Sequence, residues 1–598
     1  MPYGYQGRVL HVDLTNGTMH VEEPEEGFFR RYMGGRAVVA HYLLRLTRPG
    51  IDPLGPDNVL VVAPGLITGA AVSGQGRNGV GAKSPLTNGF GNAEGGGYFG
   101  SELKRAGFDA LVFTGRAPHP VYLWIHDGAA ELRDARPLWG AEVAEADERD
   151  VEQAVAAARR AFEETWGTLS AYERQRRLFR LADLIRQAAD DLAVLETTNS
   201  GKPIVEARQD VANTASCFEY YAAWAPRLYG ETIPLASADL FDYTLREPYG
   251  VCALIVPWNF PLLIAAWKAA PALAAGNTVV IKPASYTPLT ALRLAALAQE
   301  AGLPPGALNV LPGPGPVVGR ALAQHPDVDK ISFTGETETG REIMRLAATT
   351  IKKVSLELGG KGPNIVFADA DLDAALKGAL FGIYTNAGQR CTARSRLLLE
   401  ETIYEEFVAR FVEKAQRIRL GDPLDERTQM GPLISQRQRE RVLAYIALGQ
   451  REGAVVACGG RPPSDPALAR GHYLLPTVLV DVRPTMRVAQ EEIFGPVLTV
   501  LRFRDEDEAV AVANNVIYGL TASVWTRDIR RAHRVARRLR AGNISINHPV
   551  VNYLGAPFGG YKQSGIGREL GPQTLLEYTQ VKNVVVDLAA EPMDWFKV

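Results

Sequence analysis

A short polar stretch, Asn386–Ala393, places one cysteine, Cys391, among amide, hydroxyl and guanidinium side chains. A thiolate is a much stronger nucleophile than a hydroxyl group, so a cysteine in such a loop is a candidate for covalent catalysis. A lone cysteine is nevertheless more often a small buried apolar residue. The prediction of a catalytic role therefore depends on the residues that accompany Cys391.

Three further polar segments follow short apolar runs that predict strands. Asn259 lies in Val-Pro-Trp-Asn-Phe and Lys282 in Ile-Lys-Pro-Ala-Ser. An asparagine amide at a strand end can stabilise an oxyanion, and a lysine there can bind ribose hydroxyls or phosphate. The stretch Phe333–Gly340 closes another strand, and Gly335 and Gly340 let its backbone approach a pyrophosphate at a helix N-terminus. Taken singly, each segment could equally supply a turn residue or a solvated charge.

The composition excludes several classes of function. The 598 residues are 46% hydrophobic, which suffices for large cores, and the chain is too long for one compact unit. Sixty-five basic against 67 acidic residues leave a net charge of −2, so we expect no nucleic-acid or membrane partner. The four cysteines are far apart, which excludes a disulfide framework and a recognisable metal site. The chain shows no signal-peptide pattern and no run of about 18 apolar residues, so we expect a cytoplasmic protein.

The pattern of apolar residues divides the chain. Residues 1–140 contain short alternating strands separated by glycine-dense segments, which predicts a β-rich domain. Beyond them, apolar positions at helical spacing predict helices over 147–163 and 171–196. From Ala253 onward strands alternate with helices, which indicates an α/β fold with a parallel sheet covered on both sides. The basic run Arg527–Arg540 has one apolar face, including Ile529, and predicts a solvated amphipathic helix.

The polar segments recur in one order together with several others. They are Pro257-Trp-Asn-Phe, Lys282-Pro-Ala-Ser, Phe333-Thr-Gly, Glu357-Leu-Gly-Gly-Lys, Gly388-Gln-Arg-Cys, Glu491-Glu-Ile-Phe-Gly-Pro and Pro557-Phe-Gly-Gly-Tyr-Lys-Gln-Ser-Gly. In this order they resemble the aldehyde dehydrogenase superfamily over about residues 141–598. The resemblance implies a Rossmann-like coenzyme-binding domain at 141–228 and 247–358, oligomerisation strands and a tail at 229–246 and 579–598, and an α/β catalytic domain at 359–578.

The resemblance also implies an activity, the NAD(P)-dependent oxidation of an aldehyde to the carboxylic acid. Cys391 would attack the aldehyde, the Asn259 side-chain amide would hold the oxyanion, and Glu357 would activate the water that hydrolyses the thioester. NAD or NADP would be bound by Pro257, Trp258, Lys282, Ser285, Gly335, Glu336, Gly340, Leu358, Glu492 and Phe494. Phe260 and Trp267 would line an apolar tunnel for an aromatic or aliphatic aldehyde. The family further implies a homodimer or homotetramer.

Two positions depart from the commoner family pattern. Ser285 stands where NAD-preferring members often carry a glutamate that binds the ribose hydroxyls and repels a 2′-phosphate, so we expect useful turnover with NADP. Glu336 replaces a frequent serine of the phosphate-binding turn, which leaves the pyrophosphate contact there to backbone amides. The strands that precede the helix at 147–163 in family members have no counterpart in this sequence.

Residues 1–140 carry a second resemblance. Its segments are Gly34-Gly-Arg, Asp52-Pro-Leu-Gly-Pro-Asp-Asn, Gly76-Arg, Lys83-Ser-Pro-Leu-Thr, Gly96-Gly-Tyr-Phe-Gly and Leu138-Trp-Gly. They resemble the N-terminal domain of the tungsten-dependent aldehyde ferredoxin oxidoreductases, which implies a β-rich base for a tungstopterin cofactor. That family's cysteine ligands lie in later domains that this sequence lacks, so we expect no tungsten chemistry. Two alternatives stay open, a pterin-associated oxidoreductase module and an inactive fusion in which residues 1–140 are a structural or interaction module.

Overall fold

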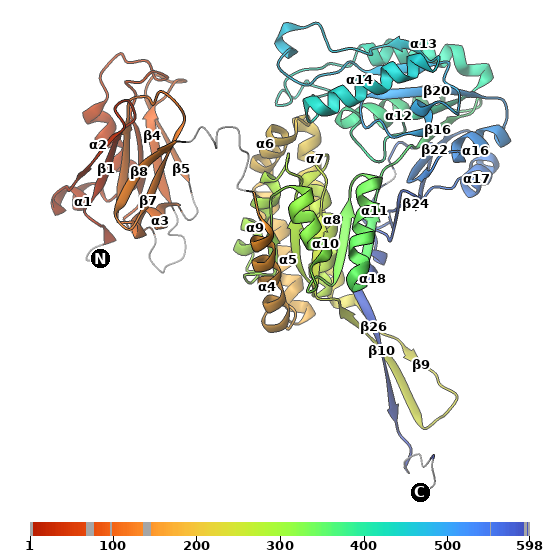
Figure 1. Cartoon of the computed structure of the whole chain (residues 1–598), viewed down its shortest axis with the longest axis horizontal. Helices are drawn as coiled ribbons and strands as arrows, with labels where there is room; N and C mark the ends of the chain where they lie inside the picture. Colours follow the sequence, from red (N-terminus) through yellow and green to blue (C-terminus); the bar gives the residue numbers. More distant parts are fainter. Residues whose placement is uncertain are drawn as a thin grey trace. The chain divides into compact units, whose positions relative to one another are not determined.

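The computed structural model describes residues 4–66, 68, 77–95, 99–134, 145–550, 552–590 and 595 (Figure 1). The chain forms two compact units, Met1–Ala141 and Glu142–Val598. The N-terminal unit contains a mixed six-stranded sheet in the order β2-β1-β6-β3-β4-β5. Its strands are β1 (Val9–Asp13), β2 (Thr18–Glu22), β3 (Leu60–Pro64), β4 (Asn78–Lys83), β5 (Phe90–Gly95) and β6 (Ala110–Thr114), and β7 (Val121–His126) and β8 (Ala129–Asp134) form a separate hairpin. The β-rich prediction for this region is confirmed.

Helices of the N-terminal unit complete two small cores on opposite faces of this sheet. The helices are α1 (Glu26–Tyr32), α2 (Gly35–Leu46) and α3 (Phe99–Arg105). Val39 of α2 packs against Val61 of β3, and it lies so close to β4 that a Cβ at Gly81 would overlap it. The predicted motif residues at 76, 96–98 and 138–140 lie outside the described residues.

Four helices begin the C-terminal unit. They are α4 (Glu148–Glu164), α5 (Ala171–Gln187), α6 (Ala189–Ser200) and α7 (Ile204–Trp224). The Asp147 side chain caps α4 by accepting hydrogen bonds from the backbone amides of Arg149 and Asp150, as its position predicts. The prediction of one helix over 171–196 is wrong, because Ala188 separates α5 from α6. Buried apolar residues continue at helical spacing from Ile185 to Leu192, so the pattern concealed the break.

A six-stranded sheet in the order β13-β12-β11-β14-β15-β25 follows, and all of its pairings except that of β25 are parallel. Its strands are β11 (Val251–Ile255), β12 (Thr278–Lys282), β13 (Leu308–Val310), β14 (Lys330–Thr334), β15 (Lys353–Glu357) and β25 (Gly565–Ile566). Along β11, Cys252 and Leu254 pack with α8 (Pro261–Ala275) and α9 (Leu289–Glu300). Val251 and Ala253 pack with α4, α10 (Arg320–Gln324) and α11 (Thr337–Ala347). Because neighbouring strand residues point to opposite faces, helices cover both sides of the sheet, as predicted.

A second parallel sheet of seven strands, in the order β18-β19-β20-β17-β16-β22-β23, has only β18 antiparallel. Its strands are β16 (Pro363–Val366), β17 (Arg396–Glu400), β18 (Val455–Cys458), β19 (Thr477–Val480), β20 (Val497–Phe503), β22 (Thr521–Trp525) and β23 (Asn543–Ile546). The helices after β16 are α12 (Leu372–Tyr384), α13 (Tyr404–Gln416), α14 (Gln436–Arg451), α15 (Arg487–Gln490), α16 (Glu506–Asn514), α17 (Ile529–Arg538) and α18 (Gln573–Glu577). A two-stranded ladder joins β21 (Tyr518–Gly519) to β24 (Tyr561–Lys562). The α/β architecture with parallel sheets predicted for this unit is thus confirmed.

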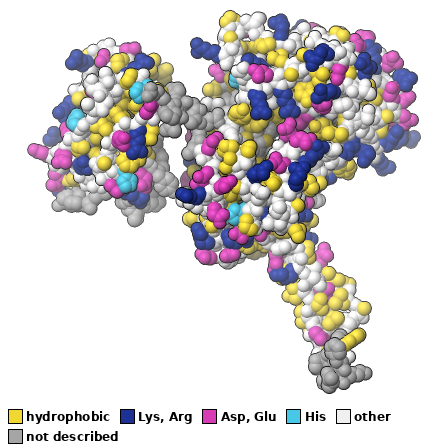
Figure 2. All heavy atoms as spheres, viewed as in Figure 1, with side chains coloured by type: hydrophobic (Ala, Val, Ile, Leu, Met, Phe, Trp, Pro, Cys, Tyr) yellow, Lys and Arg dark blue, Asp and Glu magenta, His cyan; other side chains and the backbone are white. Residues whose placement is uncertain are grey.

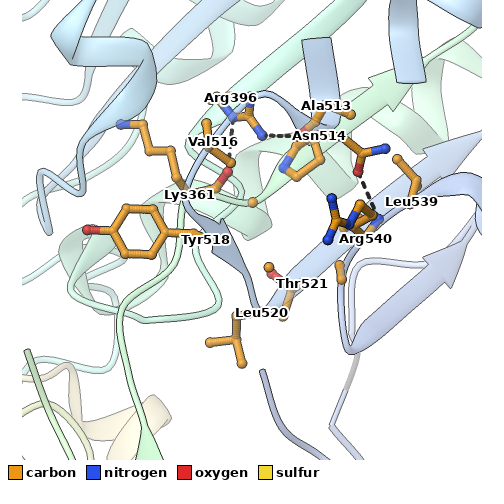
Figure 3. A pocket seen from close by; sticks show the side chains of 15 residues that line it. Lys361, Arg396, Ala513, Asn514, Val516, Tyr518, Leu520, Thr521, Leu539 and Arg540 are labelled. Carbon is orange, nitrogen blue, oxygen red and sulfur yellow. Dashed lines mark hydrogen bonds between the residues drawn. The ribbon is translucent and has the colours of Figure 1, made fainter. Parts of the chain in front are cut away.

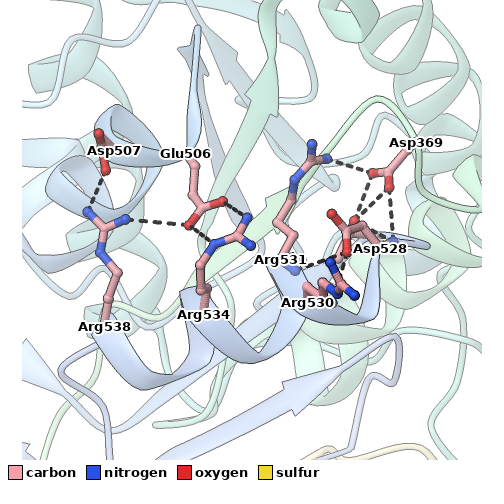
Figure 4. Close-up of polar contacts among 9 residues, drawn as sticks. Asp369, Glu506, Asp507, Asp528, Arg530, Arg531, Arg534 and Arg538 are labelled. Carbon is pink, nitrogen blue, oxygen red and sulfur yellow. Dashed lines mark hydrogen bonds and ion pairs between the residues drawn. The ribbon is translucent and has the colours of Figure 1, made fainter.

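The basic run near 530 forms the predicted amphipathic helix, α17. Ala532 and Val535 are buried, whereas Ile529 is 65% exposed, so its assignment to the apolar face is wrong. Figure 4 shows how the arginines of α17 reach acidic neighbours. Arg531 pairs with Asp369 at 3.1 Å, Arg534 with Glu506 at 2.7 Å and Arg538 with Asp507 at 2.7 Å. Three of the five arginines of α17 are thus paired with carboxylates of neighbouring segments.

A three-stranded arm projects from the C-terminal unit (Figure 1). It consists of β9 (Thr232–Ile233), β10 (Leu240–Pro248) and β26 (Thr579–Asp587), in the order β26-β10-β9. The nine residue pairs of β10 and β26 are antiparallel and run from Leu240 opposite Asp587 to Pro248 opposite Thr579. Hydrophobic side chains are visible along the arm in Figure 2. Across the described ranges, no helix combines the length and the apolar character needed to cross a membrane.

Candidate active site

The predicted catalytic residues meet in one cleft between the two parallel sheets of the C-terminal unit. Cys391, Glu357 and Asn259 all line it. So do the predicted coenzyme residues Pro257, Trp258, Gly335, Glu336, Leu358, Glu492 and Phe494, together with Thr334, Gly359, Gln438 and Arg441. Lys282, Ser285, Gly340, Phe260 and Trp267 lie outside its lining. The cleft stands at the carboxyl ends of β11, β14 and β15, where parallel sheets bind ligands.

The loop that carries Cys391 is buried, although its composition is polar. Asn386 and Ala387 adopt left-handed backbone conformations with φ of 50° and 52°, and Gly388 follows with 71°. A Cβ at Gly388 would overlap the carbonyl of Gly495, so this position requires glycine. Left-handed residues other than glycine cost free energy and are retained where the surrounding structure over-determines them, often at functional sites.

Side-chain amides pair with backbone groups in and around this loop. The Asn386 amide nitrogen donates to the backbone carbonyl of Asn259 at 2.9 Å. The Asn259 amide nitrogen in turn donates to the carbonyl of Gln389 at 2.8 Å. The Gln389 side-chain oxygen accepts from the backbone N–H of Ile434 at 2.9 Å. These bonds fix Asn259 beside Cys391 and leave the second amide hydrogen of Asn259 available for another acceptor.

Cys391 is half-buried, and its surroundings disfavour the thiolate. Burial raises the pKa of Cys391 to about 12, and the negative charges of Glu492 and Glu357 add to this effect. Cys217, Cys252 and Cys458 are buried elsewhere and do not line the cleft. These surroundings therefore favour the protonated thiol of Cys391 at neutral pH.

Glu357 ends β15 and is almost fully buried. Neither of its carboxylate oxygens has a hydrogen-bond partner among the described residues. Burial raises the pKa of Glu357 well above its usual value, and the charge of Glu569 acts in the same direction while Lys268 opposes it. A carboxylate that is easily protonated and has no fixed partner is suited to receive a proton.

Two residues beside Glu357 were missed by the sequence analysis. Lys268 and Glu569 form a buried ion pair, and the Lys268 ammonium also donates to the Ser332 hydroxyl at 2.9 Å. Lys268 is the one charged residue in α8, whose other residues are apolar. A lysine is almost never fully buried unless it is paired, so its position in an apolar helix was a usable signal. Nothing in the sequence pointed to Glu569 as its partner.

The coenzyme side of the cleft offers a close backbone approach and unused donors. A Cβ at Gly335 would overlap the Phe333 ring, so this turn requires glycine. The hydroxyls of Thr334 and Thr337 are buried without a partner in the described part of the chain. They stand at the N-terminus of α11, where backbone amides and hydroxyls can bind phosphate oxygens. Gly340, by contrast, allows α11 to pack against Leu358.

Two acidic residues on this side have different surroundings. Glu336 stands at the N-cap of α11 but its side chain does not cap the helix, and it pairs instead with Arg441 at 3.3 Å. Glu492 accepts a hydrogen bond from the Gly360 amide at 2.8 Å, and burial raises the pKa of Glu492 to about 7. The Phe494 ring lies edge-on to Trp258, with centroids 5.2 Å apart. These residues fit a nicotinamide dinucleotide, which needs both a phosphate cradle and a flat apolar contact.

Lys282 and Ser285 follow the neighbouring strand β12. Burial lowers the pKa of Lys282 to about 8, and its ammonium donates to the carbonyl of Pro283 at 2.8 Å. Ser285 is exposed, and its hydroxyl donates to the carbonyl of Gly313 at 3.2 Å. Both residues stand at the same edge of the sheet as the cleft.

The two predicted substrate residues lie at and within α8. The Phe260 ring is 4.0 Å from the Lys202 ammonium, and Trp267 meets the Phe558 ring with centroids 5.6 Å apart. Phe260 and Leu554 pack against the same apolar cluster as Cys391.

Another cavity, shown in Figure 3, contains none of the predicted site residues. Lys361 and Arg396 line it, and the Arg396 guanidinium donates to the carbonyls of Lys361, Val512 and Ala513. Figure 3 shows the Lys361 side chain extending away from the other lining residues. Within the described ranges, no group of three or more His, Cys, Asp or Glu side chains could hold a metal ion.

Comparisons with known proteins identify the family to which this chain is similar. The aldehyde dehydrogenase family model matches residues 135–584. Betaine aldehyde dehydrogenase of Bacillus subtilis (strain 168) is 48% identical over 457 residues, which are 76% of this chain and 93% of that protein. The human mitochondrial aldehyde dehydrogenase is 48% identical over 449 residues, covering 74% of this chain and 86% of that protein.

Solved structures agree with the sequence matches. A putative aldehyde dehydrogenase from Burkholderia cenocepacia superposes with a TM-score of 0.75 at 48% identity, covering 76% of this chain and 93% of that one. Betaine aldehyde dehydrogenase from Staphylococcus aureus in complex with NAD+ superposes with a TM-score of 0.75 at 42% identity. The match covers 76% of this chain and 90% of that one. The chain therefore belongs to the aldehyde dehydrogenase family, and the enzyme class predicted from its motifs, NAD(P)-dependent aldehyde dehydrogenase, is confirmed.

The second predicted resemblance is confirmed as well. The model for the N-terminal domain of aldehyde ferredoxin oxidoreductase matches residues 9–161. It overlaps the aldehyde dehydrogenase match over residues 135–161. Because the dehydrogenase match covers most of the chain, neither a pterin-associated module nor an inactive fusion is favoured.

The charges around Cys391 lead to a first prediction. Substituting Glu492→Gln removes the largest of the charge effects that raise the pKa of Cys391, so the thiolate fraction at pH 8 should increase. We expect iodoacetamide to alkylate Cys391 about three to ten times faster than in the parent. Mass spectrometry of the Cys391 peptide measures the rate. Glu491→Gln is the matched control and should leave it unchanged, and equal rates in all three proteins would contradict the electrostatic account.

Proposed function

We propose that the chain oxidises an aldehyde to its carboxylic acid through a thioester on Cys391. The observation that carries this proposal is the convergence of Cys391, Glu357 and Asn259 in one cleft. An oxidised nicotinamide coenzyme, when bound, supplies the hydride acceptor. Trp258, Gly335, Glu336, Glu492 and Phe494 would hold it in the cleft, and Lys282 and Ser285 would hold its adenosine side.

The first chemical step belongs to Cys391 and Asn259. The thiol loses its proton, and its sulfur attacks the aldehyde carbon to form a carbon–sulfur bond. The oxyanion then accepts hydrogen bonds from the free amide hydrogen of Asn259 and from the Cys391 backbone N–H. Because Asn259 is already held by Gln389, this donor is positioned before the substrate arrives. Because Cys391 is only half-buried, its thiol proton can pass to solvent water, which leaves the Glu357 carboxylate unprotonated for the second step.

Hydrolysis of the thioester depends on Glu357. Its carboxylate takes a proton from a water molecule while the water oxygen attacks the thioester carbon. The carbon–sulfur bond then breaks, Cys391 leaves as a thiolate, and the carboxylic acid is released. The buried pair of Lys268 and Glu569 keeps opposite charges close to Glu357, so it influences the charge state of this base.

The role of Glu357 is tested by separating the two steps. In Glu357→Gln the thioester should form but hydrolyse slowly, so steady-state turnover should fall at least about 100-fold. Stopped-flow absorbance of reduced coenzyme should then show a burst, and intact-protein mass spectrometry should show an acyl adduct that Cys391→Ala lacks. A Glu357→Gln enzyme that turns over at the parent rate would contradict this assignment, and an adduct that persists in Cys391→Ala would exclude Cys391 as the nucleophile.

The adenosine side of the site supports use of both coenzymes. Ser285 carries no charge, so no carboxylate at this position repels a 2′-phosphate. We expect useful turnover with NADP and a ratio of kcat/KM values for NAD and NADP of less than about 100. Ser285→Glu should raise that ratio about tenfold or more, while Ser285→Ala should change it little. A parent that prefers NAD by several orders of magnitude would contradict the prediction.

The arm supports self-association. On one face of β10 and β26, Phe241, Tyr243 and Leu245 lie beside Val584 and Val586, and Phe241 is 44% exposed. Exposed apolar strands are sites of pairing or packing with another chain. We propose that the arm binds a second copy of the chain and gives a homodimer or homotetramer.

Sedimentation velocity tests this assembly. The parent should sediment as a dimer or tetramer, and Phe241→Asp combined with Val586→Asp should release monomers because two charges would be buried at the interface. Gln580→Asp, on an exposed residue at the base of β26, is the control and should not dissociate the oligomer. A parent that sediments as a single chain would contradict the proposal.

A further inference from the structure

The chain enters the C-terminal unit beside the adenosine side of the proposed coenzyme site. Ala146, just before α4, donates its backbone N–H to the carbonyl of Pro312 at 2.8 Å. A Cβ at Gly313 would lie 3.1 Å from the Ala146 carbonyl oxygen, so this glycine permits the close approach. Ala146 is also partly buried against the apolar cluster that includes α4 and β11. The segment before α4 is therefore docked on the loop that follows β13.

The same loop contacts the residue that replaces the usual ribose-binding glutamate. The Ser285 hydroxyl donates to the Gly313 carbonyl at 3.2 Å. Lys282 stands three residues earlier, at the end of β12, and β12 pairs directly with β13. Glu145 directly precedes Ala146, so its backbone stands next to the loop that Ser285 touches. Burial lowers the pKa of Lys282 to about 8, and the negative charge of Glu145 opposes that shift.

We propose that Glu145 is a coenzyme-selecting residue whose carboxylate acts at the 2′ position of the adenosine ribose. This inference rests on the proposed function, because it requires NAD(P) in the cleft. A carboxylate accepts hydrogen bonds from ribose hydroxyls and repels a 2′-phosphate. Ser285 provides no such charge, and Glu145 supplies it from outside the sheet. Glu145 therefore restores part of the preference for NAD that Ser285 removes.

The local structure separates this role from a purely structural one. Asp147 caps α4, and Asp150 completes the capping box, so the helix start does not depend on Glu145. The Glu145 side chain is exposed, and its substitution leaves no cavity. Glu148, in the first turn of α4, is also exposed and offers a control with the same chemistry.

The experiment compares two ligands that differ by one phosphate. Adenosine 2′,5′-bisphosphate and adenosine 5′-monophosphate are titrated by calorimetry into the full-length parent, Glu145→Gln and Glu148→Gln. Removing one negative charge near the 2′ position should strengthen binding of the bisphosphate about tenfold. The affinity for the monophosphate should change by less than about twofold. The ratio of kcat/KM values for NADP and NAD should rise in Glu145→Gln by a similar factor. Glu148→Gln should match the parent in both measurements.

Three outcomes would overturn the inference. Unchanged affinities in Glu145→Gln would show that its charge does not reach the ligand. An equal loss of affinity for both ligands in Glu145→Gln would indicate a structural role. An equal gain of affinity for the bisphosphate in Glu148→Gln would indicate a general charge effect at the N-terminus of α4. A parent that binds neither NAD nor NADP would instead refute the proposed function, and this inference with it.

Discussion

The active site depends on burying a polar loop whose backbone groups need hydrogen-bond partners. Asn386, Ala387 and Gly388 turn through left-handed conformations, so regular secondary structure cannot satisfy the backbone there. The amides of Asn386, Asn259 and Gln389 do so instead, each through a hydrogen bond to a neighbouring backbone group. The same bonds hold Cys391 against the end of β11. The polar side chains of the loop thus make its burial possible, and the placement of Cys391 follows from the same hydrogen bonds.

Burial acts on the ionisable groups of the cleft in one direction, toward neutrality. It raises the pKa of Cys391, Glu357 and Glu492, and on the adenosine side it lowers the pKa of Lys282. The groups on the nicotinamide side also interact with one another, so they titrate together rather than one by one. A charge that enters such a site changes several protonation states at once. This makes the reactivity of the thiol depend on what else occupies the cleft.

The sequence was most informative about candidate site residues that lie at the ends of strands. Asn259 and Glu357 belong to segments that close neighbouring parallel strands, and such ends meet at one edge of a sheet, so motif order was enough to bring them together with Cys391. The pair of Lys268 and Glu569 was not predictable in the same way, because its members are 301 residues apart and only the fold joins them. The break between α5 and α6 was hidden for a local reason, since no glycine or proline marks it and the apolar spacing continues across it.

The junction between the two resemblances lies inside a folded unit. The two family matches share residues 135–161, which include most of α4. Val151 and Val155 of α4 nevertheless pack in one core with Val251 of β11, so α4 belongs physically to the dehydrogenase unit whichever family its sequence resembles. Its buried face is constrained by β11, and the residue before its cap is held by Pro312. Ala146 therefore stands next to the loop that contacts Ser285, so the start of the dehydrogenase unit and the end of β12 are joined through the same loop.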